Sequence, residues 1–427
     1  MRVIKEATVG ELASNRAELS ETVRQLIERV RIGGDAAVRE LSEQFDHWSP
    51  DSFRLSAQQL DEIVGSVDPT VLEDIRFAQA QIRRFAEAQL ASINDVEIET
   101  IPGVVLGHKN VPVDSVGCYV PGGRYPMVAS AHMSVLTAKV AGVRHVTACT
   151  PPINGEFPRE TIAAMVLAGA DEIYILGGVH AVAAMAIGTE TIGAVDMIVG
   201  PGNAYVADAK RQLFGEVGID LLAGPTEVMV IADHTADAEM IATDLLGQAE
   251  HGPTSPAVLI TLDEALGHAT VVEVERQLQH LQTADVAGPA WRDFGRVLLV
   301  DSHEEAAALS DQMAFEHIEI LTEDPSWYLN HLRNFGALFL GPETNVAYGD
   351  KVIGTNHTLP TRRAARYTGG LWVGKFIKTV TYQRCTPEAS AIIGAFGSRL
   401  CAIERFAGHQ AQADLRVARY GVVAANT

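Results

Sequence analysis

The 427-residue sequence lacks most features that would assign it to a secreted, membrane-spanning or disulfide-stabilised class. Its four cysteines, Cys118, Cys149, Cys385 and Cys401, form no Cys-x-x-Cys pair, which argues against a zinc ribbon or redox pair and for a reducing compartment. No stretch reaches the roughly 18 apolar residues of a spanning helix, and the N-terminal Met-Arg-Val-Ile-Lys-Glu has no apolar run of signal-peptide length. We therefore expect a soluble, cytoplasmic protein.

Basic residues are scarce, with 33 Lys and Arg against 54 Asp and Glu, and the formal net charge is -21. Nucleic acids and anionic membranes are bound through clustered Lys and Arg, so we expect neither as a partner. One region differs. Between Asp350 and Arg384 there are seven basic residues, and Asp350 is the only acid.

Aromatic residues make up only 6% of the chain, whereas apolar residues make up 47%, which is typical of enzymes built from βα repeats. The length suggests two main domains. Between about 119 and 225, Gly142, Gly169 and Gly193 each follow a helical pattern and precede a β-rich run, at intervals of 27 and 24 residues. This repeat predicts a parallel sheet with crossover helices.

A second βα series follows from 226 to about 345, the first 100 residues are mostly helical in pattern, and helices are expected around 387 to 407. We therefore predict an α/β protein with two incomplete Rossmann-like parallel-sheet domains, interleaved in sequence, and helical terminal segments. The predicted parts are an arm at 1–14, an α/β domain at 15–118 and 226–372 carrying the zinc and catalytic residues, an NAD-binding α/β domain at 119–225, and a C-terminal helical segment at 373–427.

Glycine-rich loops follow the predicted strands at 121–123, 177–178 and 200–203. The carboxyl ends of parallel strands bind ligands, since helix N-termini there offer unpaired N–H groups to phosphates. The strict Gly-x-Gly-x-x-Gly fingerprint is absent, and Gly-Pro-Gly-Asn is also common in plain tight turns. From pattern alone, a dinucleotide site and ordinary turns both remain open.

Two short stretches carry groups suited to catalysis. Gln-Ala-Glu-His at 248–251 places a side-chain carbonyl and an imidazole three residues apart on one helix face, which is metal-ligand spacing. Phe-Glu-His-Ile-Glu-Ile at 315–320 places a carboxylate and an imidazole just before a strand. Either stretch alone is more often a surface or capping group. Further donors at 349–350, 354–357 and 407–409 lie in glycine-rich surroundings and favour a metal-assisted enzyme.

The sequence resembles the histidinol dehydrogenase family over most of its length. Six motifs carry the resemblance in the same order along the chain: Cys-Tyr-Val-Pro-Gly-Gly (118–123), Ile-Val-Gly-Pro-Gly-Asn-Ala-Tyr-Val (198–206), Ala-Gly-Pro-Thr-Glu-Val (223–228), Gln-Ala-Glu-His-Gly (248–252), Glu-His-Ile-Glu-Ile (316–320) and Gly-Thr-Asn-His-Thr-Leu-Pro (354–360). The resemblance implies a homodimer with a shared active site, one zinc per subunit, and NAD-dependent oxidation of a primary alcohol to a carboxylate through an aldehyde.

The resemblance also implies roles for individual residues. His317 would be the general base and Glu316 would activate water, roles that suit a neutral imidazole and an adjacent carboxylate. The zinc ligands, which would also contact substrate, are Gln248, His251, Asp350 and His409, the last from the partner subunit. Mixed nitrogen and oxygen ligands suit a catalytic rather than a closed structural zinc. The remaining expected contacts are Thr226, His357 and Glu404 with substrate, and Tyr119, Asn203 and, where the family has Gln, His180 with the cofactor.

The chain also departs from the biosynthetic members of the family. Phe315 replaces a Pro, Thr226 replaces a Ser, and His132 lies in a segment where those enzymes carry Ser-Ser-Val and an Asn. The basic residues after 360 replace a segment poor in charge. Guanidinium groups repel a cationic substrate and bind sulfonate or phosphate oxygens.

The basic segment therefore favours an anionic substrate and resembles the sulfopropanediol dehydrogenase branch, which oxidises 2,3-dihydroxypropane-1-sulfonate to sulfolactate. His132 and Asn356 are expected anion contacts, and Arg366 and Lys375 are further candidates. A basic solvated face or a dimer contact is the alternative interpretation of this segment. Two other functions stay open: histidinol dehydrogenase itself, and a non-redox protein such as a two-lobed binding protein or a zinc hydrolase.

Overall fold

The computed structural model describes residues 1–8, 16–122, 126–222 and 224–421. Part of the predicted arm (9–14), Gly123 of the first motif and Ala223 of the third lie outside the described residues. The chain forms two compact units, one of residues 1–88 and 113–376 and the other of residues 89–112 and 377–427. Among the described residues, no helix is long and apolar enough to cross a membrane.

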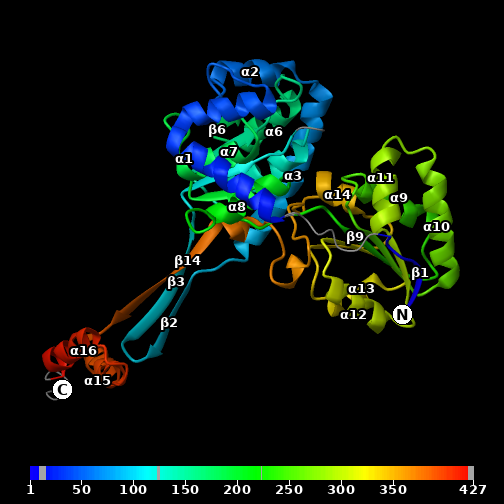
Figure 1. The fold of residues 1–427 in the computed structure, drawn as a ribbon. Coiled ribbons are helices and arrows are strands. Elements are labelled where there is room, and N and C mark those ends of the chain that lie inside the picture. The colour runs from blue at the N-terminus through cyan, green and yellow to red at the C-terminus, as the bar shows by residue number, and fades with distance from the viewer. Residues whose placement is uncertain (9–15, 123–125, 223, 422–427) are drawn as a thin grey trace. The chain divides into compact units, whose positions relative to one another are not determined.

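The first unit contains a five-stranded sheet in which all neighbouring strands are parallel, in the order β6-β5-β4-β7-β8. Figure 1 labels its edge strand β6 and the helices around it. Its strands are β4 (Ser115–Tyr119), β5 (His145–Thr150), β6 (Glu172–Ile175), β7 (Met197–Val199) and β8 (Gly218–Ile219). The connecting helices are α4 (Val128–Ala131), the π-helix η1 (His132–Leu136), α5 (Thr137–Val140), α6 (Arg159–Ala168), α7 (Gly178–Ile187) and α8 (Ala204–Leu213). Gly169 ends α6 with a left-handed φ of 94°, as the glycine pattern predicts.

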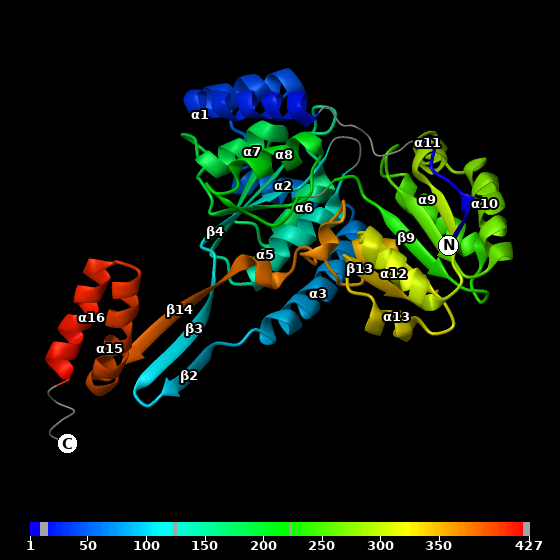
Figure 2. The ribbon, with the colours of Figure 1, turned by 60° about the horizontal axis from the view of Figure 1, so that its bottom comes forward.

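Three long helices precede this sheet: α1 (Arg16–Asp46), α2 (Ala57–Ser66) and α3 (Pro69–Ala91). Val23, Ile27 and Val30 recur at helical spacing on α1 and join the core that α7 and α8 form on the sheet (Figure 2). α2 packs against α6, another helix of the same sheet. The prediction grouped residues 15–118 with 226–372, whereas α1 and α2 pack on the helices α6, α7 and α8 that connect the strands of the five-stranded sheet.

A six-stranded sheet, in the order β1-β11-β10-β9-β12-β13, completes the first unit. All its neighbours are parallel except β1, which pairs antiparallel with β11. Its strands are β1 (Arg2–Lys5), β9 (Val228–Ala232), β10 (Ala257–Thr261), β11 (Arg296–Leu299), β12 (His317–Leu321) and β13 (Ala337–Leu340). Helices cover both faces: one core includes residues of α9 (Ala238–Ala249), α10 (Glu264–Leu278), α11 (Ala284–Phe294) and α14 (Val346–Lys351), and the other of α12 (His303–Met313) and α13 (Pro325–His331).

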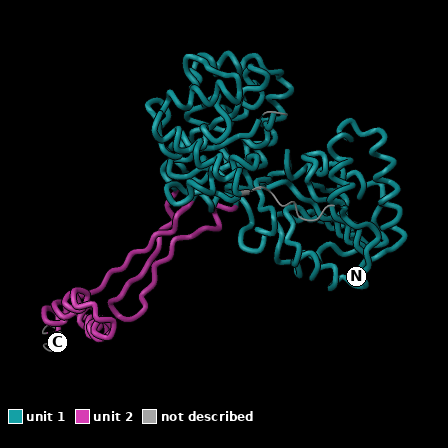
Figure 3. The backbone as a smooth tube through the Cα atoms, in the orientation of Figure 1, with its two compact units in different colours: residues 1–88, 113–376 teal, residues 89–112, 377–427 magenta. Residues whose placement is uncertain are grey.

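After α14 the first unit ends in two short 3-10 helices, η2 (Ala364–Arg366) and η3 (Val373–Phe376). The second unit has an antiparallel sheet in the order β14-β3-β2 and two helices that pack on each other (Figure 3). These elements are β2 (Val96–Ile101), β3 (Val104–Pro112), β14 (Ile377–Cys385), α15 (Pro387–Ile403) and α16 (Ala407–Tyr420).

The predicted helical segment at 373–427 therefore contains a nine-residue strand before its two helices. Most residues of β14 are exposed, so the strand has no alternation of buried and exposed side chains that would reveal it in the sequence. Its partner β3 lies more than 260 residues earlier, and the nine-residue register between them forms only in the folded chain.

Candidate active site

The candidate catalytic residues meet at the amino end of the six-stranded sheet. Glu316 and His317 lie where β12 begins, and Thr226 and Glu227 lie just before the paired strand β9. α9 runs back from the carboxyl end of β9, so its last turn brings Gln248 to the same edge. Asp350 comes from α14. The side chains at this edge thus come from two strands and two helices, and the first, Thr226, is more than 120 residues before the last, Asp350.

A chain of short hydrogen bonds links three of these side chains. The amide Nε2 of Gln248 donates to Oγ1 of Thr226 at 2.6 Å, and that hydroxyl donates to Oε2 of Glu316, also at 2.6 Å. The backbone N–H of Glu227 donates to the same Glu316 oxygen at 3.2 Å. The carboxyl group of Glu316 is therefore held in place from two sides.

The orientation of the His317 ring follows from its surroundings. Nδ1 lies 3.1 Å from the carbonyl oxygen of Glu227, which can only accept, and farther, at 3.4 Å, from the Gln248 amide nitrogen. The closer contact assigns the proton to Nδ1 and the lone pair to Nε2. Nε2 has no hydrogen-bond partner among the described residues and faces Oδ1 of Asp350 at 3.8 Å. Burial lowers the pKa of His317 to about 4, so the ring is neutral at pH 7.

Burial has the opposite effect on the carboxyl groups of the site. It raises the pKa of Glu316 well above its ordinary value, that of Glu227 to about 7 and that of Asp350 to about 6. Lys351 is nearby, with Nζ 3.9 Å from Asp350 Oδ2, but its side chain is half exposed. Desolvation thus outweighs the opposite effect of the two nearby cations, which is that of Arg362 on Glu227 and that of Lys351 on Asp350.

Two further histidines are His357, which contacts α4, and His132, the first residue of η1. His357 lies between the Asp350 carbonyl oxygen, 3.1 Å from Nδ1, and the Ser130 hydroxyl, 3.1 Å from Nε2. Burial lowers its pKa to about 3. His132 is buried, with Nδ1 accepting from the Gln79 amide at 3.1 Å, and burial lowers its pKa to about 4. Both rings are therefore neutral at pH 7.

The remaining predicted residues are placed as follows. Desolvation, and then the positive charge of Lys351, lowers the pKa of His251. The His251 ring in turn lies close enough to His317 to lower the pKa of His317. Asn356 donates to the Met133 carbonyl at 2.9 Å and accepts from Thr358 N at 2.9 Å, so both ends of its amide are engaged by backbone. Glu404 and His409 belong to the second unit, whereas Gln248, His251 and Asp350 belong to the first.

The predicted cofactor residues lie at the carboxyl ends of the five-stranded sheet. The Tyr119 hydroxyl accepts from Gly178 N at 3.2 Å. His180 is buried, with Nε2 3.6 Å from Asp46 Oδ2. Asn203 caps α8 by accepting from two backbone N–H groups. Gly200 has a φ of 114°, and a Cβ there would lie 2.0 Å from the Tyr119 carbonyl oxygen, so only glycine lets this loop approach β4.

Sequence reasoning missed two acidic residues beside the site, Glu227 and Glu319. Glu227 follows Thr226 in a motif that was read only for its hydroxyl. Glu319 is the second acid of Glu-His-Ile-Glu-Ile, and the alternation placed it in a strand without showing that it is buried beside α9 and α14. Both acids lie within motifs of the histidinol dehydrogenase family, and this position in a motif is the feature of the sequence that could have identified them.

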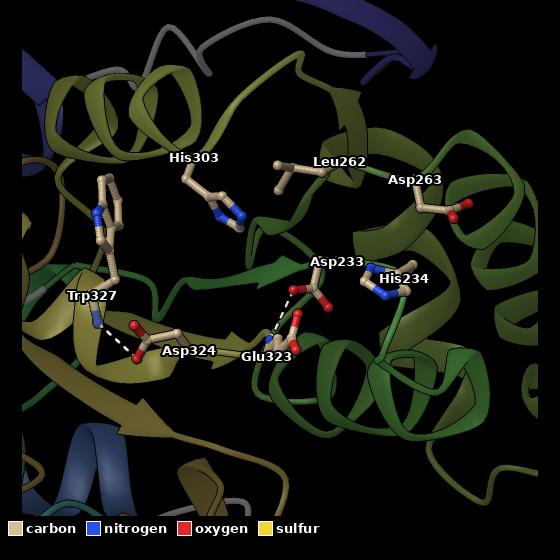
Figure 4. A pocket seen from close by; sticks show the side chains of 8 residues that line it. All are labelled: Asp233, His234, Leu262, Asp263, His303, Glu323, Asp324 and Trp327. Atoms are coloured by element: carbon tan, nitrogen blue, oxygen red, sulfur yellow. Dashed lines mark hydrogen bonds between the residues drawn. The ribbon is translucent and has the colours of Figure 1, made fainter.

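A separate pocket of about 400 Å³ lies at the opposite, carboxyl end of the six-stranded sheet (Figure 4). It is lined by Asp233, His234, Leu262, Asp263, His303, Glu323, Asp324 and Trp327. Three of its carboxylates hold backbone N–H groups: Asp233 accepts from Glu323 N at 2.8 Å, Asp263 caps α10 and Asp324 caps α13. These acids therefore have structural roles.

A fold with two parallel α/β sheets, one carrying glycine-rich loops and the other a neutral histidine among buried carboxyl groups, defines an α/β enzyme with acid–base chemistry. Comparison with known proteins specifies the class. The family model for histidinol dehydrogenase matches residues 11–417. A crystal structure of histidinol dehydrogenase from Elizabethkingia anophelis is 32% identical, with a TM-score of 0.90 over 99% of this chain and 100% of that one.

Curated relatives agree with this assignment. A histidinol dehydrogenase homolog from Shouchella clausii is 67% identical over 96% of this chain and 97% of its own length. The sulfopropanediol 3-dehydrogenase of Ruegeria pomeroyi is 45% identical over 95% and 94%. The histidinol dehydrogenase of Rhizobium meliloti is 42% identical over 94% and 92%. The chain belongs to the histidinol dehydrogenase family and is an oxidoreductase of that type.

Proposed function

We propose that this enzyme uses zinc and NAD to oxidise a small anionic diol, 2,3-dihydroxypropane-1-sulfonate, to 3-sulfolactate through the aldehyde. The overall reaction consumes the primary alcohol, one water and two NAD⁺ and yields the carboxylate, two NADH and three protons. The observation that carries the choice of an anion is the placement of Lys351 and Arg362 beside the buried acids of the site. The name of the 45% identical sulfopropanediol 3-dehydrogenase supports the same substrate.

The two basic residues are held there by specific contacts. Lys351 follows Asp350 directly, and its Nζ lies 3.9 Å from Asp350 Oδ2. The backbone N–H of Arg362 donates to Oε1 of Glu227 at 3.2 Å, and its side chain packs against Gly224. Arg362 and Arg363 both have positive φ, 53° and 64°, which is uncommon outside glycine and is found at functional sites. A sulfonate bound at this position would accept charge-assisted hydrogen bonds from both cations.

The other basic residues of the segment have less suitable positions. Nε of Arg366 donates to the Arg363 carbonyl at 3.0 Å, and Lys375 lies in η3. Lys378 and Arg384 belong to β14 in the second unit. The candidates Arg366 and Lys375 therefore have weaker support than Lys351 and Arg362.

The donor set fits a divalent cation. The described residues contain no group of three or more His, Cys, Asp or Glu side chains placed to hold a metal ion, since Gln248 is an amide and His409 lies in the second unit. What favours a cation is charge: Glu316, Glu227 and Asp350 are buried together, and each has a raised pKa. Bound by Gln248, His251, Asp350 and His409 of the partner subunit, zinc would supply Lewis-acid polarisation of the substrate hydroxyl.

The residues of the chain divide the proton transfers between them. His317 Nε2, with its free lone pair, takes the proton of the substrate hydroxyl, and NAD⁺, when bound, would supply the hydride acceptor. After the aldehyde forms, Glu316 removes a proton from the attacking water, and the raised pKa of this carboxyl makes it a stronger base once ionised. Thr226 holds Glu316 in position for this second step. Tyr119, His180 and Asn203 are the expected cofactor contacts.

A second copy of the chain is the expected partner, because the second unit has an uncovered apolar face. On α15, the side chains of Ile392, Phe396, Leu400 and Ile403 are all more than half exposed and recur at helical spacing. A helix with such a stripe requires a partner surface. A homodimer would cover it and would bring His409 and Glu404 of one subunit to the other subunit's site.

Histidinol dehydrogenase activity is the second candidate, favoured by the names of the relatives at 42% and 32% identity. Purified, zinc-loaded enzyme should be given each substrate with NAD⁺ while NADH is followed at 340 nm. We expect turnover of the sulfonate diol and little of histidinol. Turnover of histidinol alone, together with rescue of a histidine auxotroph by the gene, would reject the sulfonate assignment.

A further inference from the structure

Glu319 is a carboxylic acid in the middle of a hydrophobic strand. It is 1% exposed, and its neighbours across the sheet are Val230 on β9 and Phe339 on β13. An apolar side chain would fill this position at lower cost, because burying a carboxyl group is unfavourable unless it is well partnered. The proposed proton transfers do not use it. Its presence therefore calls for a structural partner.

The partners of Glu319 come from the two helices that carry predicted metal ligands. Oε1 accepts a hydrogen bond from the backbone N–H of Val346, the first residue of α14, at 3.1 Å. The carboxyl group also lies within hydrogen-bonding reach of Asp244 on α9. Oε2 is buried and has no hydrogen-bond partner among the described residues. Burial, and then the neighbouring Asp244, raises the pKa of Glu319, so the pair retains a proton between its two carboxyl groups.

The residues that make both contacts lie on the same elements as residues of the candidate active site. Asp244 lies one helical turn before Gln248, so the two side chains share a face of α9. Glu319 lies two residues after His317, so both project from the same face of β12. Val346 begins the six-residue helix that carries Asp350. Asp244, Glu319 and Val346 thus form a layer directly behind Gln248, His317 and Asp350.

We propose that the carboxyl pair of Glu319 and Asp244 is a positioning brace that fixes α9, β12 and α14 relative to one another and so sets the spacing of Gln248, His317 and Asp350. Only one part of this proposal rests on the proposed function, namely the effect of the brace on the geometry of the zinc site. Its structural part, the tethering of α14, is independent of the metal. Hydrogen-bonded groups behind metal ligands commonly change metal affinity by about 10- to 100-fold when removed.

The test compares two substitutions at Glu319 in the full-length protein. Glu319→Gln keeps an oxygen for Val346 N and gains an amide that can donate to Asp244. Glu319→Leu keeps the size and loses both contacts. The matched control is Asp233→Asn, which alters another buried carboxylate that holds a backbone N–H, at the opposite end of β9. Circular dichroism first establishes that each variant is folded.

Two readouts separate the brace from the proposed function. The first is amide hydrogen exchange of residues 346–351 in the metal-free protein, which we expect to quicken at least tenfold in Glu319→Leu and to change little in Glu319→Gln and Asp233→Asn. Unchanged exchange in Glu319→Leu overturns the brace, whatever the metal does. The second is the zinc dissociation constant, measured by competition with a chromophoric chelator.

We expect the zinc dissociation constant to rise about 10- to 100-fold in Glu319→Leu and less than about threefold in the other two variants. Equal zinc affinity in the parent and Glu319→Leu would overturn the role of the brace at the site. Failure of the parent to bind zinc counts against the proposed function instead, and hydrogen exchange then decides the brace alone.

Discussion

Nε2 of His317 lies 3.8 Å from Oδ1 of Asp350 and has no hydrogen-bond partner among the residues that the structure describes. The Glu227 carbonyl fixes the proton on the opposite nitrogen, so the lone pair of Nε2 is directed toward the predicted metal ligand. A substrate hydroxyl bound beside Asp350 would meet that lone pair. This relationship makes His317 the first residue to test.

We expect His317→Ala to lower kcat for alcohol oxidation by about 10²- to 10⁴-fold, because general base catalysis typically contributes that much. The measurement is steady-state NADH formation at saturating substrate. A suitable control is His331→Ala, since His331 lies exposed on α13 and stacks on Trp327. Normal turnover by His317→Ala would remove the base from the proposed mechanism.

The hydrogen-bond chain from Gln248 through Thr226 to Glu316 gives a second prediction. Thr226→Val keeps the shape but removes the hydroxyl that joins the Gln248 amide to the Glu316 carboxyl, a loss worth about 1–3 kcal/mol. We expect kcat for oxidation of the aldehyde to fall about tenfold or more. Thr226→Ser keeps the hydroxyl and should stay within about threefold of the parent. Equal rates for the Val and Ser variants would show that the hydroxyl is dispensable.

The parts of the structure that could be predicted from the sequence are those that depend on residues close together in the chain. The β-rich run after each helical stretch is a local signal, and it correctly predicted a parallel sheet. Gly169 ends α6 as predicted, whereas α7 ends before Gly188 and not at Gly193. The motif residues Glu316, His317, Thr226 and Gln248 were named from the sequence, and the structure places them within one hydrogen-bonded group. Their catalytic roles stay predictions.

What the sequence did not reveal depends on tertiary contacts. The nine-residue strand β14 pairs with a strand more than 260 residues away. The apolar stripe of α1 shows that the helix is buried, but either sheet could have received it. Glu319 is an acid in a strand whose burial arises only when α9 and α14 close over it. In each case a local pattern was compatible with several partners.

The anionic substrate predicts a charge-specific effect at Lys351. We expect Lys351→Gln to raise KM for the sulfonate diol about tenfold or more, because a charge-assisted hydrogen bond contributes roughly 1.5–3 kcal/mol. KM for an uncharged diol such as 1,2-propanediol should change little. Lys378→Gln, in the second unit, is the matched control. Equal effects of Lys351→Gln on charged and uncharged substrates would indicate a role in positioning Asp350 instead.

The buried carboxyl of Glu227 predicts a dependence of stability on pH. Burial raises its pKa from 4.5 to about 7 in the folded chain. Between these values the folded state keeps a proton that the unfolded chain has released, so the stabilisation present below pH 4.5 is lost as the pH rises through 7. The full loss corresponds to about 3 kcal/mol.

The comparison variant is Glu227→Gln, which does not titrate. Urea unfolding of the metal-free proteins, with a chelator present, gives the free energy of unfolding at each pH. We expect the difference between Glu227→Gln and the parent to shift in favour of the variant by up to about 3 kcal/mol between pH 4.5 and 8. A difference that stays constant with pH would mean that Glu227 has an ordinary pKa.

The shared active site can be tested by complementation between subunits. His317 and His409 lie in different compact units, and the exposed apolar stripe of α15 is the surface through which we propose that two copies of the chain associate. His317→Ala and His409→Ala homodimers should each be nearly inactive. If each site combines His317 of one subunit with His409 of the other, a mixed dimer carries both lesions in one site and leaves the second intact. Random reassembly of an equal mixture after mild denaturation should therefore restore about a quarter of the parent's activity. Sites built from a single chain would give no recovery, because every subunit would carry one lesion.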